Sequence, residues 1–190
     1  MAETEKRFSA QNIEVREDDG SIRVSGYAAV FDQETNIGGA FMESISRGAF
    51  NSAINRQDDV VFLINHGGLP LARTRSGTLK ISEDEHGLLM EAELAADDPD
   101  VRSIVPKMKR GDLDKMSFAF VPSRQEWDDS GDIPKRSIKD IDRLVDVSIV
   151  TTPAYEGTDI GLRSLEAHRE AQKPTTQAPR RMRMKGRLNE

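Results

Sequence analysis

The sequence of 190 residues contains no cysteine and only three histidines. The absence of cysteine excludes disulfide bonds, thiol nucleophiles and cysteine-ligated zinc sites. The sequence also lacks a run of the about eighteen apolar residues that a membrane-spanning helix requires. Its first residues, MAETEKRFSAQ, contain no apolar segment typical of a secretory signal. We therefore expect a location inside the cell and no membrane partner.

The motifs of several common enzyme classes are absent as well. There is no HExxH motif of a zinc hydrolase, no GxSxG motif of an α/β-hydrolase and no GxxxxGK motif of a phosphate-binding loop. Two of the histidines, His86 and His168, lie in polar stretches where solvated side chains are expected. We expect neither a metal nor another cofactor.

Charge divides the chain into two parts. Residues 163–190 contain eight Lys or Arg and three Asp or Glu, a net charge of +5, whereas residues 1–162 contain nineteen basic and thirty acidic residues, a net charge of −11. Residues 163–190 also show no apolar periodicity, which predicts a basic, disordered tail behind a folded domain at 1–162. Because residues 1–162 are acidic, nucleic acid is not expected as a partner. Any binding of nucleic acid would depend on residues 163–190 alone.

The pattern of apolar residues predicts an α+β domain that is mainly β. Residues 1–20 are expected to be polar and, at their start, mobile. Residues 32–41 and 123–134 are expected to be loops, and residues 46–56 to form a short helix with Ser46 as its N-cap. Strands are expected at 22–31, 58–68, 77–84, 87–95, 114–122 and 135–151. Since most of these strands follow one another directly, a doubly wound sheet is disfavoured.

A second helix has strong local signals at both ends. Asp98 is a suitable N-cap, Pro99 a suitable first residue and Gly111 a suitable terminator. The apolar face between them consists of Val101, Ile104, Val105 and Met108. Pro106 lies inside this segment and is expected to kink or split the helix, because proline lacks the backbone N–H.

Three polar residues stand out because their surroundings are apolar. His66 follows an apolar run and precedes two glycines, although a hydrogen-bonded histidine at a strand end would fit the same pattern. Ser117 lies in MSFAF on the face opposite to the methionine and the phenylalanines, where a close packing contact would also favour a small residue. Asp146 interrupts RLVDVSIV and by alternation shares a face with Leu144 and Ser148, a face that could instead be solvated.

The three residue types are those that a serine hydrolase combines: a nucleophile, a base and a carboxylate that orients the base. A buried carboxylate is costly unless it is paired, and an imidazole partner would keep Asp146 ionised. Their spacing alone does not bring them together, and the chain order His, Ser, acid matches none of the familiar triad orders. At this point catalysis and the structural explanations both stay open.

A set of motifs in a fixed order resembles one protein family. From about Arg7 to Leu162, the chain is similar to the prohead proteases, or head maturation proteases, of tailed bacteriophages. The resemblance is carried by SGYAAVFD, FMESISRGAF, FLINHGGLPLART, GTLKISEDEHGLLMEAEL, KRGDLDKMSFAF and VDVSIVTTPAYEGT. It implies an assemblin-like fold similar to that of the herpesvirus maturation proteases, namely a closed β-barrel surrounded by a few helices.

The resemblance also implies a serine endopeptidase. His66 matches the family histidine and Ser117 the nucleophile, whereas Asp146 lies where many relatives have glutamate. Aspartate has the shorter side chain, so its strand must come closer to the imidazole. The implied protein substrates are the scaffold, or the scaffolding segment of the major capsid protein, and the protease itself. The implied place is inside the procapsid, in the cytoplasm of the bacterial host.

Some questions stay open at the level of sequence. Self-association is not indicated or excluded, and residues 163–190 could be a scaffold-binding segment or a plain linker. A non-catalytic capsid assembly or scaffold-binding protein of the same fold is the alternative to a protease.

Overall fold

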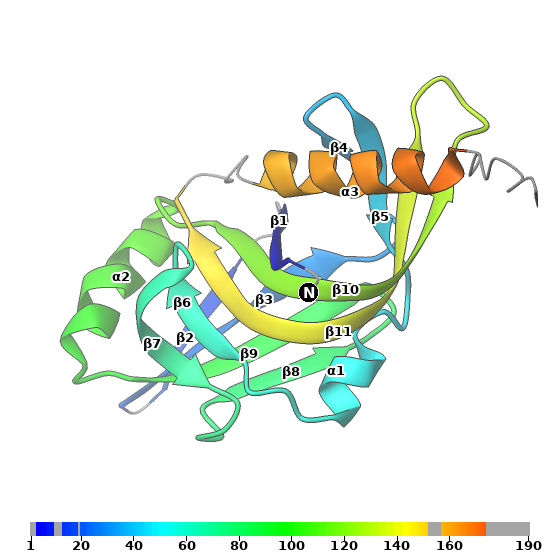
Figure 1. The fold of residues 1–190 in the computed structure, drawn as a ribbon. Coiled ribbons are helices and arrows are strands. Elements are labelled where there is room, and N and C mark those ends of the chain that lie inside the picture. The colour runs from blue at the N-terminus through cyan, green and yellow to red at the C-terminus, as the bar shows by residue number, and fades with distance from the viewer. Residues whose placement is uncertain (1–2, 10–12, 19, 152–156, 174–190) are drawn as a thin grey trace, which may run out of the picture.

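The structure, a computed structural model, describes residues 3–9, 13–18, 20–151 and 157–173, which form eleven strands and three helices (Figure 1). The strands are β1 (Glu5–Ser9), β2 (Glu14–Asp18), β3 (Ser21–Val30), β4 (Thr35–Ile37), β5 (Phe41–Ile45), β6 (Val61–Ile64), β7 (Gly67–Arg73), β8 (Leu79–Glu83), β9 (Gly87–Ala95), β10 (Lys115–Asp128) and β11 (Lys135–Val150). The helices are α1 (Asn51–Asn55), α2 (Pro99–Arg110) and α3 (Gly157–Gln172). None of these helices is long and apolar enough to cross a membrane.

The strands form two sheets that share one core. The larger sheet has seven strands in the order β1-β10-β11-β5-β4, with β6 paired to β11 and β7 paired to β6. The smaller sheet has the order β2-β3-β9-β8. The long strands β10 and β11 curve over the smaller sheet (Figure 1). The prediction of a mainly β domain with a few helices is confirmed.

The expected closed barrel is wrong. Strand β11 pairs in parallel with β5 along residues 135–138 and with β6 along residues 146–149, so the larger sheet branches at β11 instead of continuing as one ring. Among the described residues, no strand pairing joins the larger sheet to the smaller one. The two sheets are therefore held together by side-chain packing and not by a continuous set of backbone hydrogen bonds.

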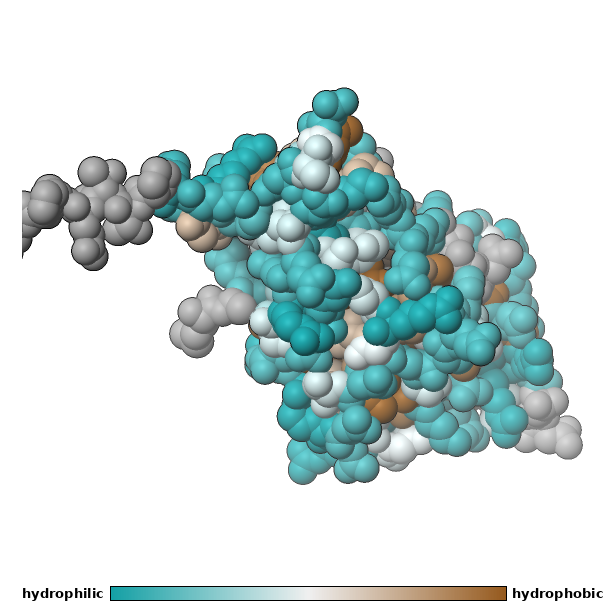
Figure 2. Space-filling view, turned by 90° about the vertical axis from the view of Figure 1, so that its right-hand side faces the viewer, coloured by the Kyte–Doolittle hydropathy of each residue, from teal (hydrophilic) through white to brown (hydrophobic). Residues whose placement is uncertain are grey.

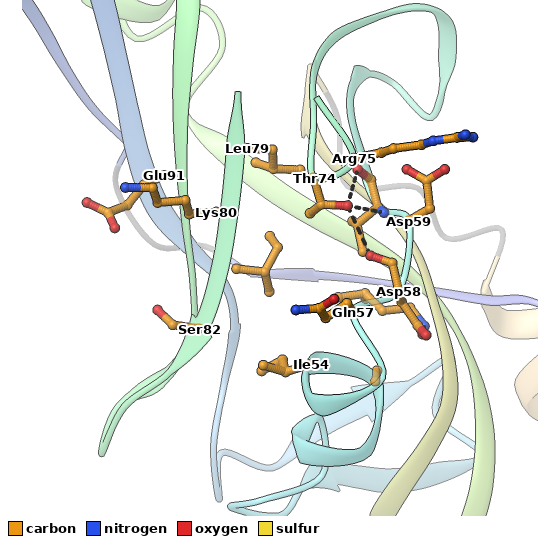
Figure 3. A pocket seen from close by; sticks show the side chains of 14 residues that line it. Ile54, Gln57, Asp58, Asp59, Thr74, Arg75, Leu79, Lys80, Ser82 and Glu91 are labelled. Carbon is orange, nitrogen blue, oxygen red and sulfur yellow. Dashed lines mark hydrogen bonds between the residues drawn. The ribbon is translucent and has the colours of Figure 1, made fainter. Parts of the chain in front are cut away.

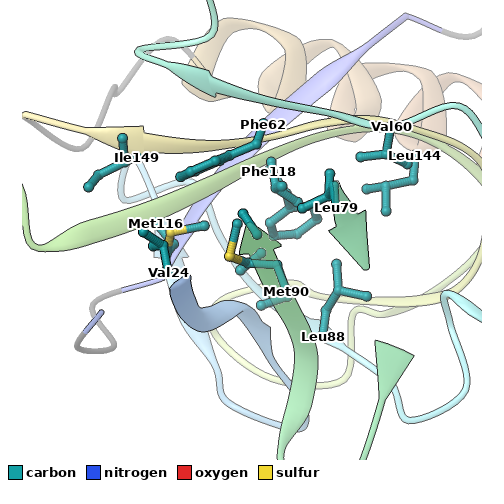
Figure 4. Packing of buried hydrophobic residues seen from close by; sticks show 14 of the residues in the cluster. Val24, Val60, Phe62, Leu79, Leu88, Met90, Met116, Phe118, Leu144 and Ile149 are labelled. Atoms are coloured by element: carbon teal, nitrogen blue, oxygen red, sulfur yellow. The ribbon is translucent and has the colours of Figure 1, made fainter. Parts of the chain in front are cut away.

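The core lies between the two sheets. Apolar side chains of β3, β8 and β9 contact those of β6, β10 and β11, as Figure 4 shows. The side chains that it labels are Val24, Val60, Phe62, Leu79, Leu88, Met90, Met116, Phe118, Leu144 and Ile149. On β10, the core-facing residues are Met116, Phe118 and Phe120, as alternation predicts, which leaves Ser117 on the other face. The outer surface drawn in Figure 2 is mainly hydrophilic.

Helix α2 forms as its local signals predict. The carboxylate of Asp98 accepts a hydrogen bond from the backbone N–H of Asp100 at 2.7 Å, and Gly111 ends the helix with a φ of 81°. The predicted apolar face is buried. The predicted split at Pro106 is wrong, because α2 continues from Pro99 to Arg110. The proline ring lies on the exposed side of the helix, away from the core.

Helix α1 is shorter than predicted. It covers Asn51–Asn55 and begins after Phe50, so Ser46 is not its N-cap. The backbone N–H of Ser46 instead donates to the carbonyl of Ile138 at 2.9 Å. This tertiary hydrogen bond ties the start of the predicted helix to β11.

The two ends of the chain are more ordered than the sequence suggests. Residues 5–9 and 14–18 are strands, although no strand is predicted before residue 22. Helix α3 runs to Gln172 and buries Leu165, so the expected disorder is wrong for residues 163–172. The rest of the predicted tail, 174–190, lies outside the described residues, and the division into two parts stays a prediction.

Several shorter elements were also missed. Strands β4 and β5 and most of β7 lie where loops or no element were expected, and β10 extends to Asp128, into the predicted loop at 123–134. Strand β7 contains two glycines, and β4 and the end of β10 are mainly polar, so their local pattern is not that of a strand.

Candidate active site

A tight hairpin presents His66. Strands β6 and β7 are joined by a two-residue turn, because Ile64 pairs directly with Gly67. The two turn residues, Asn65 and His66, have positive φ angles of 50° and 57°, as a type I′ turn requires. The side-chain oxygen of Asn65 accepts a hydrogen bond from the backbone N–H of Thr151 at 3.0 Å. This bond fixes the turn to the end of β11 and so holds the imidazole beside the sheet.

A β-bulge separates Asp146 from the core. Ala119 of β10 lies opposite Asp146, whereas the next residue, Phe120, lies opposite Leu144. Val145 therefore has no opposite residue, and Leu144 turns into the core. The prediction that Leu144 and Asp146 share a face is wrong for this reason. The bulge allows a carboxylate to lie on the outer face of a strand whose neighbouring residues are apolar.

The structure brings the three predicted side chains together. Nδ1 of His66 lies 2.6 Å from Oδ1 of Asp146, and Nε2 lies 2.7 Å from Oγ of Ser117. All three are buried, with side-chain exposures of 4% for His66 and 7% for Asp146 and a residue exposure of 4% for Ser117. A neutral imidazole with its proton on Nδ1 donates to the carboxylate and leaves Nε2 free to accept from the hydroxyl. This arrangement can transfer a proton from the serine to the imidazole.

Ser148 completes the support of this site. Its hydroxyl donates to Oδ1 of Asp146 at 2.7 Å and accepts the backbone N–H of His66 at 3.2 Å. The residue is completely buried and lies opposite Ser117 in the pairing of β10 with β11. Alternation predicts Ser148 on the face of Asp146, but no role for it follows from the sequence. A hydroxyl two residues after the carboxylate on one strand was the available signal, because such residues share a face.

The hydroxyl of Ser117 has a second neighbour. It donates to the backbone carbonyl of Arg7 in β1 at 2.8 Å. Strand β1 pairs antiparallel with β10 and lies at the edge of the larger sheet. No residue of β1 was among the predicted site residues, because this segment was expected to be mobile.

Four buried charges anchor β1 next to the site. The guanidinium of Arg7 contacts both oxygens of Glu43 at 2.5 and 2.9 Å, and that of Arg136 contacts both oxygens of Glu5 at 2.7 and 2.8 Å. Burial opposes ionisation of Glu5, but the hydrogen bonds and charges of Arg136 and Arg7 hold its pKa below the ordinary value. Burial likewise opposes the charge of Arg7, but Glu43 and Glu5 raise its pKa. The four charges balance, as buried ions must.

Comparison with protein-family models gives a match over residues 11–172, to the model described as caudovirus prohead serine protease. The chain belongs to this family. The matched region contains His66, Ser117 and Asp146, whereas β1 precedes it. Membership makes the protein, in general terms, a serine protease of capsid maturation, as the resemblance implied. Neither the curated proteins nor the solved structures gave a match.

A large pocket of this prohead protease family member lies elsewhere. The pocket has a volume of about 930 Å³ and lies between α1, β8 and the turns that flank β6 and β7 (Figure 3). Its rim includes Asp58, Asp59, Arg75 and Lys80, and none of the three predicted site residues lines it. The pocket and the hydrogen-bonded site are therefore separate. No group of three or more metal-binding side chains occurs among the described residues.

Proposed function

We propose that the protein is a serine endopeptidase in which Ser117 is the nucleophile, His66 the general base and Asp146 the residue that orients the imidazole. One observation carries the proposal: an unbroken chain of hydrogen bonds runs from Asp146 through His66 to Ser117. The position of these residues within the matched family region supports it.

The reaction follows from the positions of the protons. Nε2 of His66 accepts the hydroxyl proton as Oγ of Ser117 attacks the peptide carbonyl, and the carboxylate of Asp146 stabilises the imidazolium that forms. Nε2 then gives this proton to the leaving amine, and an ester on Ser117 remains. A water molecule, deprotonated by the same nitrogen, hydrolyses the ester and restores the hydroxyl. General base catalysis of this kind contributes about 10²–10⁴-fold to the rate.

The proposed substrates are the scaffold, or the scaffolding segment of the major capsid protein, and the protease itself. Cleavage would take place inside the procapsid in the bacterial host. Membership in the prohead protease family supports capsid proteins as the general substrate class. The charge distribution of the protein does not favour one of these substrates over another.

The test is cleavage of the capsid and scaffold proteins by the purified chain. Wild-type protein should produce discrete fragments, and Ser117→Ala should produce none, because the nucleophile is lost. Ser82→Ala is the matched control, since Ser82 is exposed on β8 in the other sheet. Equal cleavage by Ser117→Ala would remove Ser117 from the mechanism. Binding of intact substrate by wild-type protein, with no fragments, would favour the non-catalytic assembly protein.

A further inference from the structure

The proposed nucleophile is covered in the structure. Ser117 is only 4% exposed, yet an attacking oxygen must come within about 3–3.5 Å of a peptide carbonyl carbon. A substrate can therefore reach Ser117 only if a neighbouring element moves. The element whose backbone touches the hydroxyl is β1, through the carbonyl of Arg7.

Strand β1 lies as an extended peptide substrate would lie. It runs antiparallel to β10, with Arg7 opposite Phe118 and Phe8 opposite Ser117. The carbonyl that contacts Oγ of Ser117 belongs to the peptide bond between Arg7 and Phe8. An extended peptide commonly binds by adding such a strand to the edge of a sheet, and β1 is the edge strand here.

The contact of β1 also opposes catalysis. Oγ of Ser117 has one proton and two neighbouring acceptors, the carbonyl of Arg7 at 2.8 Å and Nε2 of His66 at 2.7 Å. While the proton is given to the carbonyl, it is not available to the base. Removal of β1 would both uncover the hydroxyl and leave the imidazole as its acceptor.

The side chains of β1 follow a charge pattern that the body of the protein complements. Residues i and i+2 of a strand share a face, so Glu5 and Arg7 point the same way. Below them lie Arg136, which binds Glu5 through two hydrogen bonds, and Glu43, which binds Arg7 through two. Arg136 also binds Glu43 at 2.8 Å and Arg7 binds Glu5 at 2.6 Å, so the four charges form one network. A peptide with an acidic residue two positions before a basic one would complete this network on Arg136 and Glu43 in place of β1.

Helix α3 adds weaker contacts to this segment. Arg163 forms an exposed ion pair with Glu3, just before β1, at 2.7 Å, and the hydroxyl of Ser164 lies 3.4 Å from Glu5. Figure 1 shows α3 beside β1, on the side away from β3. Exposed ion pairs contribute little to stability, so the buried charges are the main anchor of β1.

We propose that the edge of β10 is the substrate-strand site of this protein and that β1 fills it in the structure. An extended peptide takes the place of β1, pairs antiparallel with residues 116–120, and carries an acidic residue where Glu5 lies and a basic residue where Arg7 lies. The inference rests on the proposed function, because Ser117 would attack the carbonyl of the substrate residue that takes the position of Arg7.

The test measures how fast a fluorophosphonate labels Ser117 in the full chain, read as a mass change. Arg7→Ala leaves Arg136 as the one guanidinium shared by the buried carboxylates of Glu5 and Glu43. Because one negative charge is then uncompensated, this variant should label at least about tenfold faster than wild type, as more molecules have β1 detached. Arg16→Ala is the matched control, because this arginine of β2, in the smaller sheet, is 75% exposed, and it should label at the wild-type rate. Circular dichroism verifies folding, and Glu5→Gln replaces Arg7→Ala if the latter is unfolded.

A peptide tests the charge pattern of the site. The blocked peptide Glu-Lys-Arg-Phe-Ser, the sequence of residues 5–9, should slow labelling of Arg7→Ala at least about fivefold, whereas the same peptide with Asp in place of Arg should not. Equal labelling of wild type and the folded variant, or equal protection by both peptides, would overturn the substrate-strand site and leave the proposed nucleophile in place. Absence of labelling in every variant would overturn the proposed function, and this inference with it.

Discussion

The carboxylate of Asp146 is buried in an apolar strand, and its surroundings explain how the charge is accommodated. Its Oδ1 atom has two donors, Nδ1 of His66 at 2.6 Å and the hydroxyl of Ser148 at 2.7 Å. Hydrogen bonds to an ionised group are about twice as strong as neutral ones, which offsets part of the cost of burial. The shorter side chain of aspartate suffices because β6 and β11 are directly paired strands.

The same geometry gives Ser148 a positioning role that can be measured. Ser148→Ala removes one donor from Asp146, and a hydrogen bond to a charged group contributes about 1.5–3 kcal/mol. We expect kcat for peptide cleavage to fall about ten- to hundredfold with KM nearly unchanged, because the hydroxyl acts through the carboxylate and does not touch substrate. Ser137→Ala, on the same strand and half-buried, is the control. A larger change in KM than in kcat would contradict this role.

Sequence reasoning could find the three central residues but not their neighbours. His66, Ser117 and Asp146 each have a polar side chain in apolar surroundings, and together they match the types that nucleophilic catalysis needs. The carbonyl of Arg7 could not be found in this way, because every residue has a backbone carbonyl. Its contact with Ser117 depends on the pairing of β1 with β10, two segments more than one hundred residues apart.

At the level of elements, local signals explain which predictions were confirmed. Helix α2 has a cap, a terminator and an apolar face within its own sequence, and the hairpin of β8 and β9 has alternating strands around a polar turn. Strand β1, with the sequence EKRFS, has no such pattern, because its inward side chains are charged and their partners come from β5 and β11. A polar strand of this kind is stabilised by tertiary contacts that a local pattern does not contain.

The pairing of β3 with β9 leads to a prediction about Gly87. A Cβ atom at this position would lie 2.0 Å from the backbone oxygen of Ala29, so the two strands would have to separate locally. Gly87→Ala should reduce the free energy of unfolding by about 1–3 kcal/mol, as overpacked substitutions do. Gly131→Ala is the control, since the closest atom to its Cβ would be 3.8 Å away. Urea unfolding measures both, and equal midpoints for the two variants would contradict the clash.

At the scale of the whole molecule, the branched sheet explains why a barrel was the wrong expectation. The resemblance implied a closed β-barrel, but closure depends on whether the last strands pair, which no single segment reveals. In this protein β11 divides its length between β5 and β6. Because β5 pairs only with the start of β11, the end of β11 is available to β6, and the hairpin of β6 and β7 carries His66.

The buried charges of β1 connect distant parts of the chain. The stability of the whole protein should therefore depend on the pH at which these groups change charge. The carboxylate of Glu5 faces the guanidinium groups of Arg7 and Arg136, the carboxylate of Glu43 and the hydroxyl of Ser164. Burial alone would raise the pKa of Glu5, but Arg136 and Arg7 lower it below its ordinary value of 4.5. A carboxylate with a lowered folded pKa stabilises the fold above the unfolded pKa, and this contribution disappears as the pH falls through the folded pKa.

We therefore expect the free energy of unfolding of the wild-type protein to fall as the pH decreases below about 4.5. Glu5→Gln should be less stable than wild type at pH 7, and its stability should decrease less on acidification, because the group that takes up the proton is gone. Glu14→Gln is the control, since Glu14 is 63% exposed on β2 and forms a surface ion pair. Urea unfolding between pH 7 and pH 3 measures these differences. If Glu5→Gln and wild type lose stability in parallel, the anchoring of β1 by an ionised Glu5 is wrong.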